Sequence, residues 1–377
     1  MTNQVGHGMS RRHFLASTSL ASAVGLLAPR VLFSENEVVS APGLVEKARN
    51  TAASATINVQ RLRGNISVLM GAGGNIAVLP GRDGKLLIDA GFAGARPKIA
   101  EALAGTGSDP IKHLINTHWH FDHTMGNATY LAAFPSIQII AQTETQKLIA
   151  EVNNGALARY PQRKEKTEKA LAEGKKSDGS PLTAGERKRY EKRLAGLTPT
   201  LEELKTAVQL APNVSFDREL NVDLGHRLVQ IRFLGRGHTA GDTIVYLPNE
   251  KILASGDLLV HPVPYLFGDI SVDHANTLQL MSQLDVETIV PGHGEVLHGK
   301  DYIYQVMEFL KAVNAAVERE INAGATSSDE VGLMLPKAVD INSWREKFAG
   351  DDPSNASFFD ANLHSLIASA FEQIALR

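Results

Sequence analysis

The sequence contains no cysteine. This absence excludes disulfide bonds, thiolate nucleophiles and thiolate metal ligands, so any bound metal must be held by nitrogen and oxygen atoms. The chain also lacks a strong net charge, with a formal value of −3, and therefore gives no reason to expect a nucleic-acid partner. Its 43% apolar and 21% charged residues are typical of a globular protein large enough to bury a sizeable core.

Long apolar runs are missing as well, and the one candidate lies near the N-terminus. Arg11 and Arg12 precede a mildly apolar run over residues 14–28, which is shorter than the about 20 residues that a membrane-spanning helix needs. This arrangement is typical of a twin-arginine export signal, with residues 1–41 forming the signal and a spacer. The alternative is an arginine pair that precedes an ordinary apolar helix. The export signal predicts a periplasmic location without a stable membrane span.

Strand patterns begin near residue 56. The runs "INVQRLRGNISVLMG", "GNIAVLPG" and "KLLIDAG" are rich in strand formers and are separated by glycine-containing turns, which include the hairpin signal Asp83-Gly84. They predict an antiparallel meander. "ARPKIAEALAGTG" then has helical spacing, and "IKHLINTHWH" begins as another buried strand. Strands interleaved with helices predict a layered α/β domain.

Four segments share one arrangement, in which an apolar strand ends in histidine or aspartate. They are "IKHLINTHWHFDH", "LVQIRFLGRGH", "KILASGD" and "VETIVPGH". The polar residues that they supply are His118, His120, Asp122, His123, His238, Asp257 and His293. Residues at the carboxyl ends of neighbouring strands meet along one edge of a sheet. One such histidine alone is usually a hydrogen-bonded surface residue, whereas seven ligand-type residues in this order indicate a metal site.

The motifs "HWHFDH", "GHTAGD", "SGD" and "PGHG" resemble, in order, the metal-binding motifs of the metallo-β-lactamase-fold hydrolase superfamily. The resemblance covers roughly residues 56–297 and implies a four-layer αβ/βα sandwich with its site at one end. It implies one zinc ion held by His118, His120 and His238, a second held by Asp122, His123 and His293, and Asp257 bridging both. Iron or manganese could take the place of zinc.

The chemistry of the residues supports this division. His118 and His120 are two apart in an extended segment, so their side chains leave the same face, and His238 can complete three ligands from a distant strand. Two divalent cations about 3.5–4 Å apart repel each other by on the order of 20 kcal/mol at an effective dielectric constant of 20. Neutral imidazoles cannot offset this repulsion. The carboxylates of Asp122 and Asp257 reduce the positive charge of the site.

Four residues receive further roles. Asp122 is the candidate for orienting a metal-bridging hydroxide and passing a proton to the leaving group. Asp89, at the end of "LLIDAG", either hydrogen-bonds a ligand histidine or caps a turn. His261 and Tyr265 follow Asp257 in the loop "HPVPYLFGDISVDH", where they either reach the substrate pocket or serve packing.

The sequence predicts a catalytic domain over residues 56–300, with two additions. A helical, basic insertion is predicted over about residues 143–213. It forms either a solvated helix face, a lid over the site or a membrane-surface contact. Residues 301–377 form a helical extension, with the strongly amphipathic segment "YIYQVMEFLKAVNAAVEREI". This extension either packs on the core or builds a homodimer contact.

The predicted function is metal-dependent hydrolysis of a small molecule, in which a metal-bridging hydroxide attacks an ester-like or cyclic acyl bond such as a lactone or thioester. Many β-lactam-cleaving members of the family carry cysteine or serine where this chain has Asp257, so β-lactam hydrolysis is the alternative. An iron-dependent oxidoreductase on the same fold is the alternative of another class. The export signal disfavours a nucleic-acid-processing enzyme, and open coordination positions disfavour a noncatalytic metal protein.

Overall fold

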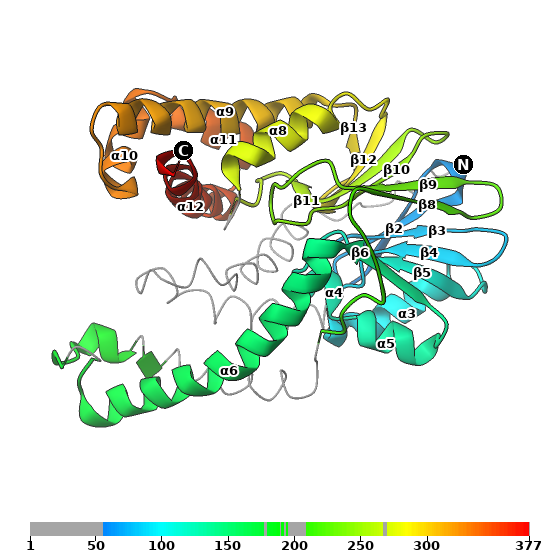
Figure 1. The fold of residues 1–377 in the computed structure, drawn as a ribbon, viewed down its shortest axis with the longest axis horizontal. Helices are drawn as coiled ribbons and strands as arrows, with labels where there is room; N and C mark the ends of the chain where they lie inside the picture. Colours follow the sequence, from blue (N-terminus) through cyan, green and yellow to red (C-terminus); the bar gives the residue numbers. More distant parts are fainter. Residues whose placement is uncertain are drawn as a thin grey trace, which may run out of the picture.

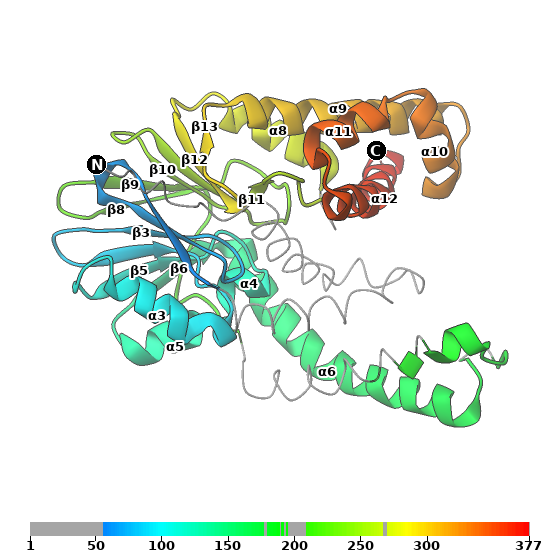
Figure 2. The same ribbon diagram turned by 180° about the vertical axis from the view of Figure 1, so that it is seen from behind.

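The computed structural model describes residues 56–176, 179–188, 190, 191, 194, 209–266 and 270–376. The predicted export signal over residues 1–41 lies outside these described residues. Two β-sheets stack face to face, and helices cover their outer faces (Figures 1 and 2). The predicted four-layer sandwich is therefore confirmed.

The first sheet holds seven strands in chain order. They are β1 (Asn58–Arg61), β2 (Ser67–Met70), β3 (Ile76–Leu79), β4 (Lys85–Ile88), β5 (Ile111–Ile115), β6 (Gln138–Gln142) and β7 (Val214–Phe216). β1 to β4 pair antiparallel, which confirms the predicted meander. β4 to β7 pair parallel. The carboxyl ends of β4, β5 and β6 therefore meet at one edge.

The second sheet has six strands in the order β13-β12-β11-β10-β9-β8. Their bounds are β8 (Glu219–Asp223), β9 (Leu228–Arg232), β10 (Ile244–Leu247), β11 (Ile252–Val260), β12 (Thr288–His293) and β13 (Leu297–His298). β11 and β12 are parallel, and the other pairs are antiparallel. The helix α8 (Ser271–Met281) connects β11 to β12, so both strands end at the same edge of this sheet.

Helices flank both sheets within the described residues. They are α3 (Arg96–Ala104), α4 (Phe121–Thr124), α5 (Asn127–Ala133), α6 (Thr143–Glu173), α8 (Ser271–Met281), α9 (Asp301–Asn322), α10 (Ser328–Met334), α11 (Ile341–Ala349) and α12 (Pro353–Ala375). Short 3₁₀ turns occupy η3 (Arg63–Asn65), η4 (Ala93–Ala95) and η5 (Leu335–Lys337). Among the helices that the structure describes, none combines the length and apolar character needed to cross a membrane.

The central strands of both sheets are buried on both faces because each face meets a separate core. In β4, Leu86 and Ile88 point into the cluster between the two sheets, whereas Leu87 points into the cluster beneath α3 and α5. This alternation follows from the two-residue period of a strand. Strands covered on both sides read as continuous apolar runs, which explains the sequence pattern "KLLI".

α6 lies in the predicted insertion and extends away from the sandwich (Figures 1 and 2). It starts directly after β6, where the side chain of Gln142 accepts a hydrogen bond from the backbone N–H of Glu144, and it ends at Gly174 in a left-handed conformation. Its first turn is fixed to the second sheet, because the hydroxyl of Thr145 donates to the carbonyl of Gly241 at 2.7 Å. The base of α6 therefore contacts the loop that carries His238.

The C-terminal residues are helical, as predicted. The apolar face of α9, which includes Phe309, Leu310 and Val313, is buried in a third cluster. The same cluster contains the outer face of the second sheet and residues of α8, α11 and α12. α9 therefore joins the C-terminal helices to the layer that carries three of the predicted ligands.

Candidate metal centre

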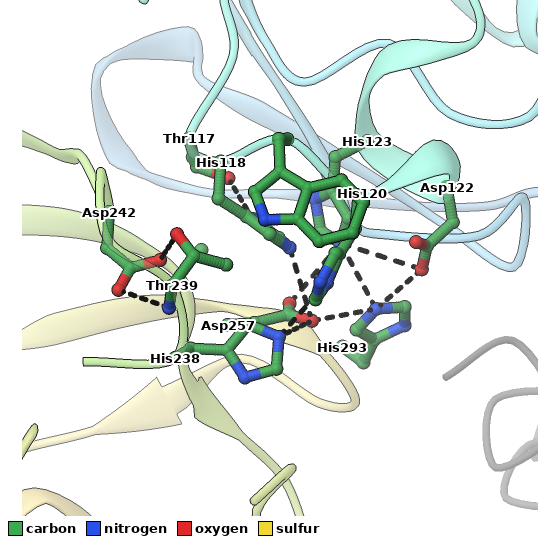
Figure 3. Close-up of polar contacts among 12 residues, drawn as sticks. Thr117, His118, His120, Asp122, His123, His238, Thr239, Asp242, Asp257 and His293 are labelled. Carbon is green, nitrogen blue, oxygen red and sulfur yellow. Dashed lines mark hydrogen bonds and ion pairs between the residues drawn. The ribbon is translucent and has the colours of Figure 1, made fainter. Parts of the chain in front are cut away.

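The predicted ligands come from both sheets and converge at one end of the sandwich (Figure 3). From the first sheet, the turn after β5 carries His118 and His120, and α4 carries Asp122 and His123. From the second sheet, His238 lies between β9 and β10, Asp257 lies within β11, and His293 ends β12. Each of the seven side chains is buried, and none is more than 4% exposed.

Their potential ligand atoms form two groups, each with all its atoms within 4.8 Å of one another. One group is His118, His120, His238 and Asp257, and the other is Asp122, His123 and His293. Apart from Asp257, which here joins the first group, these are the two sets that the family resemblance implied. Oδ2 of Asp257 lies 3.6 Å from Nε2 of both His238 and His293, and its Oδ1 lies 3.3 Å from Nε2 of His123. Asp257 therefore lies between the two groups.

The donor set fits a metal ion. Nε2 of His118 is buried without a hydrogen-bond partner. Nδ1 of His120 and Nε2 of His238 are only 3.1 Å apart, with the carboxylate of Asp257 close by. Three imidazoles and a carboxylate match the ligands that zinc takes, and catalytic zinc sites leave a position open for water or substrate. These residues would hold the first ion, and the second group offers two imidazoles and a carboxylate for another.

The protonation of the histidines differs between the groups. Burial lowers the pKa of His118 and His120 well below the usual value, which favours the neutral imidazole that binds metal. Burial also acts to lower the pKa of His293, but the carboxylates of Asp257 and Asp122 outweigh it and raise this pKa to about 9. The pKa of His123 is likewise raised, because Asp257, Asp89 and Asp122 outweigh burial. Positive charge is therefore favoured where the second cation would bind.

Asp89 contacts a ligand of the second group directly and a ligand of the first group through Thr117. Its Oδ2 accepts from Nδ1 of His123 at 2.7 Å and from the hydroxyl of Thr117 at 2.8 Å, while the hydroxyl oxygen of Thr117 accepts from Nδ1 of His118 at 3.0 Å. These bonds leave Nε2 of both histidines free to bind metal. Asp89 adopts a left-handed backbone conformation, with φ of 66°, which is uncommon for a residue other than glycine. Such a conformation is held by its surroundings and is frequent at functional sites.

Tyr265 and His261, the two other predicted site residues, differ in whether their rings reach the ligands. Tyr265 is beside the centre, with its ring centroid 5.0 Å from that of His293. The ring of His261 instead packs against Tyr302 at 5.0 Å, as the packing alternative expected. The backbone of His261 still touches the centre's scaffold, because its N–H donates to the carbonyl of His293 at 3.1 Å.

Sequence analysis missed polar residues that hold the ligand loops. Asn116 and Asn127 exchange side-chain hydrogen bonds of 3.0 and 2.7 Å across the segment that carries four ligands. Asp242 accepts from the backbone N–H and the hydroxyl of Thr239, at 2.8 and 2.7 Å, and so fixes the turn after His238 (Figure 3). The Thr-x-x-Asp spacing within "GHTAGD" is a sequence signal for the contact between Thr239 and Asp242.

Two glycines allow close approach to ligands. A Cβ atom at position 292 would collide with Oδ1 of Asp257, and one at position 74 would collide with the ring of His123. Positions 292 and 74 therefore accept only glycine as long as the side chains of Asp257 and His123 stay where they are.

A sequence model of the family described as the metallo-beta-lactamase superfamily matches residues 70–293. The chain belongs to this family. The matched range contains both ligand groups, as the sequence motifs predicted.

Known members of the metallo-β-lactamase superfamily resemble parts of the chain. It is 28% identical over 97 residues to a metallo-beta-lactamase type 2 from Bacillus sp. (strain 170), and 30% identical over 82 residues to one from Bacillus cereus. These matches cover 24% and 20% of this chain, and 37% and 32% of the relatives, so the chain spans only about a third of their length.

A double mutant of the sec-alkyl sulfatase PisA1 has a similar fold, with a TM-score of 0.56 and 13% sequence identity. The similarity covers 84% of this chain and 50% of that chain. At this identity it supports the fold alone.

Proposed function

We propose that this protein is a zinc-dependent hydrolase that cleaves an ester-like or cyclic acyl bond, such as a lactone or thioester, in a small molecule. The observation that carries the proposal is the position of Asp257 between two buried groups of nitrogen and oxygen ligands. A carboxylate there reduces the repulsion between two cations, and it suits a dinuclear centre.

In this proposal, the two ligand groups would bind the metal ions, and Asp122 and Asp89 would have additional roles. The first group would hold one ion, the second group another, and Asp257 would contact both. Two zinc ions bound there would supply a nucleophilic hydroxide at neutral pH and polarise the acyl carbonyl. Asp122 would take up the proton released when the bound water becomes hydroxide and pass it to the leaving group, because its carboxylate is buried among the ligands of the second ion. Asp89 keeps His123 in the tautomer that presents Nε2.

β-Lactam hydrolysis is the second candidate, and one observation favours it. The two Bacillus relatives are both named metallo-beta-lactamases. Ring opening of a β-lactam passes through the same kind of tetrahedral oxyanion as cleavage of a lactone or thioester. The aspartate at position 257, in place of the cysteine or serine of many β-lactam-cleaving members, is our reason for ranking acyl esters first.

Metal analysis and a substrate panel test the proposal together. Protein purified without added metal should contain close to two zinc ions per chain, and His118→Ala should lose both metal and activity. The panel comprises lactones, thioesters, β-lactams, phosphodiesters and a secondary alkyl sulfate, and we expect the highest kcat/KM for a lactone or thioester. A preference for β-lactams would support the second candidate. Bound iron without hydrolysis of any compound would point to an oxidoreductase and overturn the proposal.

We also propose that the chain is exported by the twin-arginine route and acts in the periplasm. The support is the sequence alone, because Arg11 and Arg12 lie outside the described residues. Homodimerisation through the C-terminal helices stays a prediction.

A further inference from the structure

The second ligand group is assembled across the two sheets. Asp122 and His123 belong to α4, which follows β5 of the first sheet, whereas His293 ends β12 of the second sheet. Nε2 of His293 lies 3.0 Å from Oδ2 of Asp122 and 3.2 Å from Nε2 of His123. Their spacing therefore depends on how the backbone around His293 is held against the first sheet.

Asn75 makes that connection. It lies just before β3 in the first sheet, it is 5% exposed, and its side-chain amide donates to the carbonyls of Pro291 and Gly294, each at 2.9 Å. Its backbone N–H donates to the carbonyl of Gly292 at 2.7 Å. Three hydrogen bonds from one residue thus reach the carbonyls on both sides of His293.

The residue before Asn75 contacts the other half of the same group. The backbone N–H of Gly74 donates to the carbonyl of Asp122 at 3.2 Å, and the position lies directly against the ring of His123. The turn between β2 and β3 therefore touches the segments of all three ligands of the second group. Among the described residues, no backbone hydrogen bond joins this turn to His118 or His120.

We propose that Asn75 is a positioning residue for the second ion, setting its affinity by holding His293 against Asp122 and His123. Both amide hydrogens of Asn75 are used, so a side chain without donors removes these bonds from two buried carbonyls and releases the backbone on each side of His293. Residues that hold metal ligands typically alter affinity by about 10- to 100-fold when replaced. This inference rests on the dinuclear centre of the proposed function, but not on its substrate.

The test is stepwise titration of metal-free protein with Zn²⁺ against a chromophoric chelator. In Asn75→Leu, which keeps the volume but removes the donors, the second dissociation constant should rise about 10- to 100-fold while the first changes less than about threefold. Asn75→Ser, which is smaller and keeps one donor, should show the same selective loss to a lesser degree and serves if the leucine variant fails to fold. His293→Ala defines the behaviour of a chain without the second ion.

The matched control is Asn213→Leu. Asn213 also makes two side-chain hydrogen bonds to backbone, with the N–H of Ile139 and the carbonyl of Ile137, but it contacts no predicted ligand. This variant should lower Tm and leave both dissociation constants unchanged. Folded Asn75 variants that bind two ions with the parent's affinities would overturn the inference. A parent protein that binds fewer than two ions would instead contradict the proposed centre itself.

Discussion

One carboxylate oxygen of Asp122 faces the other two residues of the second ligand group, His123 and His293. Its Oδ2 lies 3.0 Å from Nε2 of His293 and 3.6 Å from Nε2 of His123, and in the proposed mechanism its other oxygen would face the attacking water. Asp122→Asn keeps the shape but cannot accept the proton. We expect kcat to fall by about 10²- to 10⁴-fold, the range typical of lost general acid–base catalysis, while KM changes less.

Metal content decides how that result is interpreted. Loss of the second ion would lower the rate in a similar way, so the variant must be assayed with two ions confirmed by elemental analysis. At least the ion held by His118, His120 and His238 should remain. A fully metallated variant that turns over at the parent rate would leave Asp122 as a ligand only.

The raised pKa values of His123 and His293 predict that metal binding depends on pH. A pKa of about 9 keeps His293 protonated at pH 7 in the metal-free protein, and it must lose that proton to bind a cation. The affinity for the second ion should therefore weaken as the pH falls below about 9. The first ion should respond less near neutral pH, because burial lowers the pKa of His118 and His120. Zn²⁺ titrations between pH 6 and 9 measure both; equal pH slopes for the two ions would contradict this prediction.

At the scale of residues, the sequence predicted what its motifs encode. The predicted ligands lie in four short, recognisable motifs, and Asp89 is a candidate because it ends the predicted strand "LLIDAG". Asn75 and the pair Asn116 and Asn127 could not be predicted, because their partners are backbone or amide groups that only the folded chain brings together.

Among the elements, α9 is fixed to the loop that follows β11. The hydroxyl of Tyr302 shares its single hydrogen between the carbonyls of Val260 and Pro262, at 2.6 and 2.9 Å, and burial raises its pKa well above the usual value. Tyr302→Phe leaves both carbonyls without this donor, so we expect the free energy of unfolding to fall by about 1–3 kcal/mol. Denaturant unfolding measures the change.

Tyr304 supplies the control from the same helix. Its side chain is 40% exposed, so Tyr304→Phe should change the free energy of unfolding by less than about 0.5 kcal/mol. Equal effects of the two substitutions would show that the contact of Tyr302 with the loop does not stabilise the protein.

The periodicity of the sequence predicted most elements near the site. The meander, α3 and β5 all followed from strand alternation, glycine turns and helical spacing. The pairing of β6 with β7 did not, because α6 and the rest of the insertion separate these strands in the chain. Sequence patterns identify a strand more readily than its distant neighbour.

For the whole molecule, the motifs indicated the sandwich but not the partners of its apolar helix faces. The pattern of α9 predicts one buried stripe without specifying what covers it, and both packing on the core and a dimer contact fitted. In the structure, residues of α8, α11 and α12 share a cluster with Phe309 and Val313. Much of the stripe is thus covered within one chain.

The predicted export of the protein can be tested in cells by changing its arginine pair. Replacing Arg11 and Arg12 together with lysine should retain the precursor in the cytoplasm, because the arginine pair is the feature that the twin-arginine route recognises. Fractionation followed by immunoblotting shows where the protein accumulates, and the retained precursor should still bind metal. Unchanged export of the double variant would contradict the predicted route.

The metal centre also has a topological consequence for a chain without cysteine. His120 and His238 are 118 residues apart, and His123 and His293 are 170 apart, yet each pair would share one ion. Coordination would close loops of these lengths, as a disulfide does, and a covalent closure of about 100 residues is associated with roughly 4.7 kcal/mol of unfolded-state entropy. The two ions would thus crosslink the two halves of the sandwich reversibly. Removing them should lower the free energy of unfolding as well as abolish activity.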